Sequence, residues 1–190
     1  MRYIVLTLLF ISTSCDLLTT RTPQKPESPR VIFLPATSPA ILFQNFKSSL
    51  EEKILENYLS CFVDTAFLKK KFIFTPSTGA VSQYSNLINW NLDAERQFFN
   101  NFISVVKKDY PITLKLTNEL SNPLGSDSAV YQYDYELSFV TDDPTLPNMY
   151  TGSAQFKIYN DSRKQWVIVE WLDIKKENKP SWSELKGRLY

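Results

Sequence analysis

The chain has 190 residues, with 21 basic side chains, 20 acidic side chains and no histidine, which excludes a Ser-His-Asp or Cys-His catalytic relay, an imidazole metal site and a histidine pH switch. Its two cysteines form no CxxC motif and its four glycines form no phosphate-binding loop, so we expect no cofactor and no metal site. The near-zero net charge argues against a nucleic-acid partner, whereas 13 Phe, 10 Tyr and 4 Trp residues can fill a sizeable core.

The first fifteen residues, MRYIVLTLLFISTSC, have the layout of a secretory signal. Arg2 precedes an apolar run from Tyr3 to Ile11, whose nine residues would rise only ~14 Å in a helix, too little to cross a bilayer. The small residues that end at Cys15 resemble the lipobox of bacterial lipoproteins, although Ser12 stands where that family usually has Leu. The resemblance implies that residues 1–14 are removed and that the Cys15 thiol carries lipid. The alternatives are an ordinary secretory signal cut nearby and a buried first helix.

A lipidated Cys15 places the protein in the bacterial cell envelope, anchored to a membrane with its domain outside the cytoplasm. Removal of residues 1–14 takes away Arg2, which leaves 21 − 1 = 20 basic and 20 acidic side chains, so the anchor must be lipid and not a polybasic patch. Residues 15–37 are rich in proline and polar residues, which favours an extended tether that holds the domain off the bilayer. The alternative is that residues 15–37 only connect the signal to the domain and have no spacing role.

The first half of the expected domain, residues 38–190, is predicted to be mainly helical. Apolar residues recur at intervals of three and four in two long stretches, with Ser38 and Asn91 as N-caps. The expected elements are a helix over 40–63, a short helix over 64–68, a short strand over 72–75, a loop over 76–91 and a helix over 92–107.

The second half changes to a period of two, which is typical of strands. The alternating runs cover residues 112–117, 131–139, 154–158 and 166–174. Short turn-rich segments separate them, so an antiparallel meander is expected. At the C-terminus, Ser181 or Ser183 can cap a last turn that Trp182 and Leu185 would hold against the domain as a clasp.

This order of elements resembles the nuclear transport factor 2-like superfamily, also described as SnoaL-like or as a cystatin-like cone. The matching pieces are the Tyr58 region of the first helix, Trp90 at the start of the second long helix, and the run from Lys164 to Val169 in the last strand. The resemblance covers residues 38–176. It implies an α+β fold in which N-terminal helices pack on a curved, mostly antiparallel sheet of four to five strands and leave a pocket inside the cone.

Catalytic members of that superfamily, dehydratases and ketosteroid isomerases, use Asp, Tyr or His residues of the pocket as acid and base. With histidine absent, Glu170 is the candidate base, because its apolar neighbours would raise the pKa of a buried carboxyl group. A solvated or paired Glu170 is the alternative and the more common situation for a lone carboxylate on a strand. We expect the pocket to be lined by Tyr58, Trp90, Tyr133 and Glu170.

Other residues have a simpler interpretation. Asp134 and Glu136 share one face of their strand and could form an acid/base pair or bind a cation. Because they alternate with Tyr131, Tyr133 and Tyr135, an exposed polar face is the preferred interpretation, with the tyrosines in the core. Cys61 is expected to be a buried structural thiol.

These observations predict a membrane-anchored extracytoplasmic lipoprotein whose domain binds a small apolar ligand or an envelope protein, or acts structurally, without catalysis. The alternative is a dehydratase or isomerase that uses Glu170 and tyrosines of the pocket.

Overall fold

The computed structural model describes residues 33–176 and 178–190. The signal over residues 1–14, the lipid site at Cys15 and most of the tether over 15–37 lie outside the described residues. The helices are α2 (Pro39–Glu52), α3 (Leu55–Ser60), α4 (Ala80–Gln83), the 3-10 helix η1 (Ser85–Leu87), α5 (Leu92–Val105) and α6 (Trp182–Leu189). The strands are β1 (Ile73–Thr75), β2 (Thr113–Pro123), β3 (Ser128–Ser138), β4 (Met149–Asn160) and β5 (Trp166–Lys175). Within this part of the chain, no helix combines the length and the apolar character needed to span a membrane.

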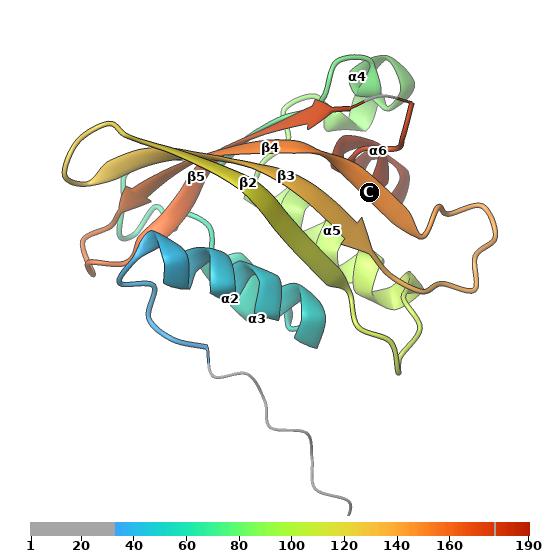
Figure 1. The fold of residues 1–190 in the computed structure, drawn as a ribbon, viewed down its shortest axis with the longest axis horizontal. Coiled ribbons are helices and arrows are strands. Elements are labelled where there is room, and N and C mark those ends of the chain that lie inside the picture. Colours follow the sequence, from blue (N-terminus) through green and yellow to red (C-terminus); the bar gives the residue numbers. More distant parts are fainter. Residues whose placement is uncertain (1–32, 177) are drawn as a thin grey trace, which may run out of the picture. The chain divides into compact units, whose positions relative to one another are not determined.

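The five strands form one sheet in the order β1-β5-β4-β3-β2. Strands β2 to β5 pair antiparallel, and β1 pairs parallel with β5. The sheet curves over α2, α3 and α5, while α6 lies near β4 and α5 (Figure 1). The α+β architecture, the meander of four strands and the curved sheet over N-terminal helices are therefore confirmed.

The first long helix is interrupted, contrary to the prediction of one helix over 40–63. Helix α2 ends at Glu52, and Lys53 takes a left-handed conformation with φ of 58°. The backbone N–H of Lys53 donates to the carbonyl oxygen of Leu50, and its Nζ donates to the carbonyl oxygens of Lys107 and Lys108 at 2.9 and 3.0 Å. These bonds stabilise a helix end that apolar periodicity alone does not indicate.

The other local predictions have mixed outcomes. The caps are confirmed: Ser38 accepts from the N–H of Ile41, Asn91 accepts from the N–H of Ala94, and Ser181 forms a capping box with Glu184. Residues 64–68 form turns instead of a helix, and the segment 76–91 contains α4 and η1 instead of an unbroken loop.

Aromatic side chains form much of the core between the sheet and the helices. Phe43 of α2 packs on Tyr131, Tyr133 and Phe156 with ring centroids 5.0–5.5 Å apart. Tyr58 of α3 stacks on Phe99 of α5 at 4.0 Å. The tyrosines of β3 thus face the core, as predicted.

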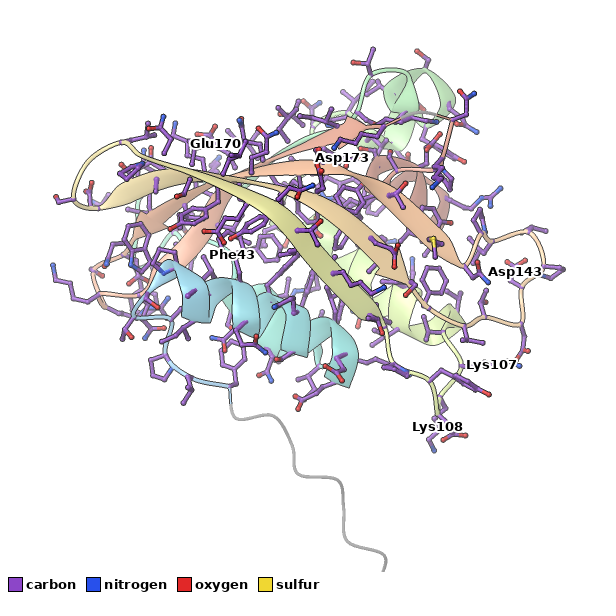
Figure 2. All side chains as sticks on the ribbon, viewed as in Figure 1. Phe43, Lys107, Lys108, Asp143, Glu170 and Asp173 are labelled. Atoms are coloured by element: carbon purple, nitrogen blue, oxygen red, sulfur yellow. The ribbon has the colours of Figure 1, made fainter. Side chains whose placement is uncertain are left out.

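Strand β5 contains a bulge that decides which way Glu170 points. Ile168 pairs with Ile158, but Glu170 pairs with Lys157, so β5 has one more residue than β4 between these two pairs. Strict alternation along the predicted strand 166–174 would place Ile168 and Glu170 on the same face. Because of the extra residue, Ile168 is fully buried whereas Glu170 lies on the outer face of the sheet, on the side away from Phe43 (Figure 2).

Candidate functional site

The structure brings together two of the four residues predicted to line a pocket. The hydroxyl group of Tyr58 and the indole N–H of Trp90 both donate to the carboxylate of Glu95, at 2.6 and 2.7 Å. Tyr133 lies elsewhere, and its hydroxyl group donates to Glu119 at 2.9 Å. Glu170 lies outside this group as well: its carboxylate pairs with Lys157 at 3.1 Å, and its side chain is 45% exposed.

A third donor completes the group around Glu95. The ammonium group of Lys186, on α6, donates to Glu95 Oε2 at 2.5 Å, and both side chains are 0% exposed. We call Tyr58, Trp90, Glu95 and Lys186 the Glu95 cluster. It joins residues of α3, α5 and α6 to the segment just before α5, and every charged or polar group in it has a partner.

Aromatic rings surround the ammonium group of Lys186. Its Nζ lies 3.9 Å from the ring centroids of Phe74 and Trp171, and 5.3 and 5.6 Å from those of Trp90 and Phe98. Contacts of a desolvated cation with aromatic faces stabilise it by about 2 kcal/mol or more. The cluster therefore combines a carboxylate and an aromatic cage, the two groups that proteins use to hold an organic cation.

Burial shifts the pKa of Lys186 and that of Tyr58. Desolvation lowers the pKa of Lys186 to about 8, although the nearby Glu95 carboxylate acts in the opposite direction. Desolvation also raises the pKa of the Tyr58 hydroxyl group well above its usual range, and the charge of Glu95 adds to this effect. Tyr58 is therefore a hydrogen-bond donor throughout the physiological pH range.

A second buried carboxylate holds the start of α6. Asp173 of β5 accepts from the hydroxyl group of Tyr135 at 2.7 Å and from the backbone N–H and hydroxyl group of Ser183 at 2.8 and 2.5 Å. The Tyr135 hydroxyl oxygen accepts in turn from the N–H of Trp182 at 2.8 Å. A carboxylate at the N-terminus of a helix satisfies free N–H groups and complements the helix dipole. Helix α6, which lies where a C-terminal clasp was predicted, is therefore attached by buried polar contacts.

Helix α6 fills the interior of the cone. Trp182, Leu185 and Lys186 are each 0% exposed. The ring of Trp182 lies 4.7 Å from that of Trp171 and 5.5 Å from that of Tyr135. Side chains of α6 thus lie beside Trp90, one of the residues predicted to line a pocket.

A more open pocket of about 420 Å³ lies elsewhere, beside α3 and the segment before α2. Its lining includes Phe33, Leu59, Glu56, Arg96 and Arg163, and none of the four predicted pocket residues. Its arginines are paired, Arg96 with Glu56 at 3.3 Å and Arg163 with Asp161 at 2.6 Å. This pocket therefore offers no free charge from either arginine.

The outer face of the sheet holds Asp134 and Glu136, as the preferred interpretation predicted. Asp134 binds Lys176, Ser153 and Asn118, and these hydrogen bonds lower the pKa of its carboxyl group to about 2. Glu136 pairs separately with Lys115 at 2.7 Å. Across the described ranges, no group of three or more His, Cys, Asp or Glu side chains is arranged to hold a metal ion.

Cys61 is buried, and its thiol donates to the carbonyl oxygen of Asn57 at 3.4 Å. Desolvation raises the pKa of this thiol. The prediction of a buried structural thiol is confirmed.

Sequence reasoning missed Glu95, Lys186 and Asp173, although Glu95 and Lys186 each leave a signal. Glu95 lies three residues after Leu92 and three before Phe98, so it belongs to the apolar face of its helix. Lys186 lies four residues after Trp182 on the face that holds α6 in place. A charged residue within an apolar stripe indicates a buried pair, and two such residues of opposite charge indicate partners.

Comparison with known proteins supports the fold. Neither a protein-family model nor a curated protein matches the sequence. A proposed aromatic ring hydroxylase from Novosphingobium aromaticivorans is similar in structure with a TM-score of 0.55 and 13% identity, over 76% of this chain and 91% of that one. A proposed dehydratase of the NTF2-like family from Streptomyces avermitilis has a TM-score of 0.54 and 11% identity, over 72% and 93% of the two chains.

The beta subunit of the benzoate 1,2-dioxygenase from Burkholderia mallei is also similar, with a TM-score of 0.53 and 15% identity, over 72% of this chain and 87% of that one. Identities this low establish the fold and leave the activity open. The chain therefore contains an α+β domain of the nuclear transport factor 2-like cone fold.

Proposed function

We propose that the protein is a lipid-anchored extracytoplasmic lipoprotein whose cone domain binds a partner or ligand, or acts structurally, without catalysis. The proposed absence of catalysis is supported by the position of α6, which places Trp182, Leu185 and Lys186 in the interior of the cone. A catalysed reaction needs space for a substrate beside a free acid or base. Here the two buried carboxylates, Glu95 and Asp173, are each held by donors of their own chain.

An isomerase or dehydratase that uses Glu170 has less support. Glu170 pairs with Lys157 on the outer face of the sheet and does not line the pocket beside α3. Neighbours in structure include proteins named for dehydration and hydroxylation, but at 9–15% identity their names do not transfer to this chain.

The lipid anchor rests on the sequence. An apolar run too short to span a bilayer ends in small residues and Cys15, and the balanced charge of the remaining chain offers no polybasic attachment to a membrane. The proline-rich residues 15–37 would then separate the domain from the lipid surface.

Metabolic labelling with palmitate tests the anchor, because the chain offers a matched control. We expect label and a lipid mass increment in the wild type and in Cys61→Ala, and neither in Cys15→Ala. A wild-type chain without label, or label that persists in Cys15→Ala, contradicts the anchor.

Incubation with a panel of small carbonyl and hydroxy-ring metabolites, followed by liquid chromatography that separates isomers and by mass spectrometry, tests the absence of catalysis. We expect the wild type to form no product whose formation is abolished by Glu170→Gln or by Glu95→Gln. Turnover that either substitution abolishes overturns the non-catalytic role.

A further inference from the structure

The packing of α6 leaves some buried polar atoms without a hydrogen-bond partner. Among the described residues, the buried side-chain atoms without a hydrogen-bond partner include Trp171 Nε1, Trp182 Nε1 and Asn86 Oδ1. All three lie where α6 packs: the two tryptophan rings are 4.7 Å apart, and Asn86 donates through Nδ2 to the carbonyl oxygen of Gly187. A buried polar group without a partner costs about 1–3 kcal/mol. The packing of α6 therefore contains unused hydrogen-bonding capacity.

The segment that leads into helix α6 offers little resistance to a movement of the helix, because residues 174–176 and 178–179 are exposed. The helix has eight residues, too few to be stable as a helix in water without the contacts that it makes here. Displacement of α6 would expose Glu95, Tyr58 and Trp90 together.

The group that α6 inserts into the interior is a primary ammonium ion. Four aromatic rings have their centroids 3.9–5.6 Å from Lys186 Nζ, and the Glu95 carboxylate accepts a hydrogen bond from it at 2.5 Å. These contacts recognise a cation that carries N–H donors. They do not depend on the ammonium group belonging to Lys186.

We propose that the Glu95 cluster, with its aromatic cage, is a binding site for a primary alkylammonium ligand, which α6 closes by inserting Lys186 in the ligand's place. The inference rests on the proposed binding function and names its ligand class. A ligand would compete with Lys186 for Glu95, so binding and release of α6 would be coupled.

Hydrogen exchange followed by mass spectrometry on the full chain in detergent tests the coupling, with n-butylammonium as the probe because it matches the end of a lysine side chain. We expect the probe to accelerate exchange of amides in residues 182–190 in a saturable way. Exchange in residues 39–52 serves as the internal control and should not change. An equal concentration of n-butanol, which lacks the charge, should have no effect.

Two variants sharpen the experiment. In Lys186→Ala the competing ammonium group is gone, so the probe should half-saturate at a concentration lower by about tenfold or more, and it should raise the melting temperature. In Glu95→Gln the probe should change neither the exchange of residues 182–190 nor the melting temperature.

The proposal is overturned if the probe leaves exchange of residues 182–190 in the wild type unchanged, up to probe concentrations that alter the control peptide. This outcome is decisive even if Lys186→Ala does not fold. An equal response to n-butanol also overturns the proposal. Palmitate labelling and the turnover assay are independent of this result, so failure of the ligand class is distinguishable from failure of the proposed function.

Discussion

The ion pair between Glu95 and Lys186 is notable because both side chains are fully buried. Two charges in a dry interior lose much hydration, and their attraction compensates only when the remaining hydrogen bonds are also satisfied. Tyr58 and Trp90 provide those bonds to Glu95, and four aromatic rings surround Lys186. The pair is therefore expected to tolerate joint replacement better than loss of one partner.

We predict that Lys186→Met destabilises the protein by about 3–5 kcal/mol, because it leaves the buried Glu95 without a counter-charge. The double variant Glu95→Gln with Lys186→Met should lose clearly less than the sum of the two single variants. Urea unfolding of the four proteins measures both quantities. Additive losses, or a loss below about 1 kcal/mol in Lys186→Met, would show that the pair is not coupled.

Asp134 gives a prediction for acid stability. Its folded pKa of about 2 lies below the ordinary value of 3.8, so its contribution to stability is present above pH 4 and is lost as the pH falls toward 2. Asp134→Asn should therefore be less stable than the wild type at pH 5, by less than about 1 kcal/mol for a partly exposed carboxylate, and the difference should shrink at pH 2. Urea unfolding at both pH values measures it, and a difference that grows on acidification contradicts the assigned role.

At the scale of elements, regular patterns in the sequence predicted regular structure. The period of two in the second half corresponds to β2, β3, β4 and β5, and the caps at Ser38, Asn91 and Ser181 are where side-chain chemistry indicated them. These features depend on residues close together in the chain, which is why sequence patterns report them.

The misplaced features depend on contacts between distant segments. The break after α2 is stabilised by bonds from Lys53 to carbonyl groups more than fifty residues away. The bulge in β5 arises from its register with β4, and it moves Glu170 to the outer face. For the same reason two predicted pocket residues meet at Glu95 while the other two do not, because Tyr58 and Glu95 lie on different helices that only the packed fold brings together.

Close packing of α6 can be tested at Gly187. A Cβ atom added there would lie 2.5 Å from Cβ of Tyr84, an atom next to the backbone that cannot easily move aside. Ala normally favours a helix by up to about 1 kcal/mol over Gly, but overpacking costs about 1–3 kcal/mol, so Gly187→Ala should be destabilising on balance.

Thermal unfolding measures this effect, and Gly125→Ala is the matched control because the nearest atom to its added Cβ lies at 3.7 Å. Replacement of Tyr84 by Ala in the Gly187→Ala background should recover part of the loss. A stabilised Gly187→Ala would mean that α6 does not lie against Tyr84.

At the scale of the whole molecule, the described domain is a cone whose interior is filled from its own C-terminal end. Residues that are far apart in sequence meet there: Tyr58 and Glu95 of the helical half, Asp173 of the last strand, and Lys186 of α6. The fold class was predictable from the order of elements. The filled interior was not, because the pattern of residues 179–187 predicts a clasp but not where it inserts.

Competitive acetylation of lysines on the native protein, with peptide mass spectrometry, tests the filled interior most directly. Lys69 and Lys164 are exposed and serve as references, whereas Lys186 is fully buried. The structure predicts that Lys186 is acetylated at least about 100-fold more slowly than the references, the factor that corresponds to a local opening free energy of about 2.7 kcal/mol. Acetylation of Lys186 at the rate of Lys69 and Lys164 would contradict the filled cone.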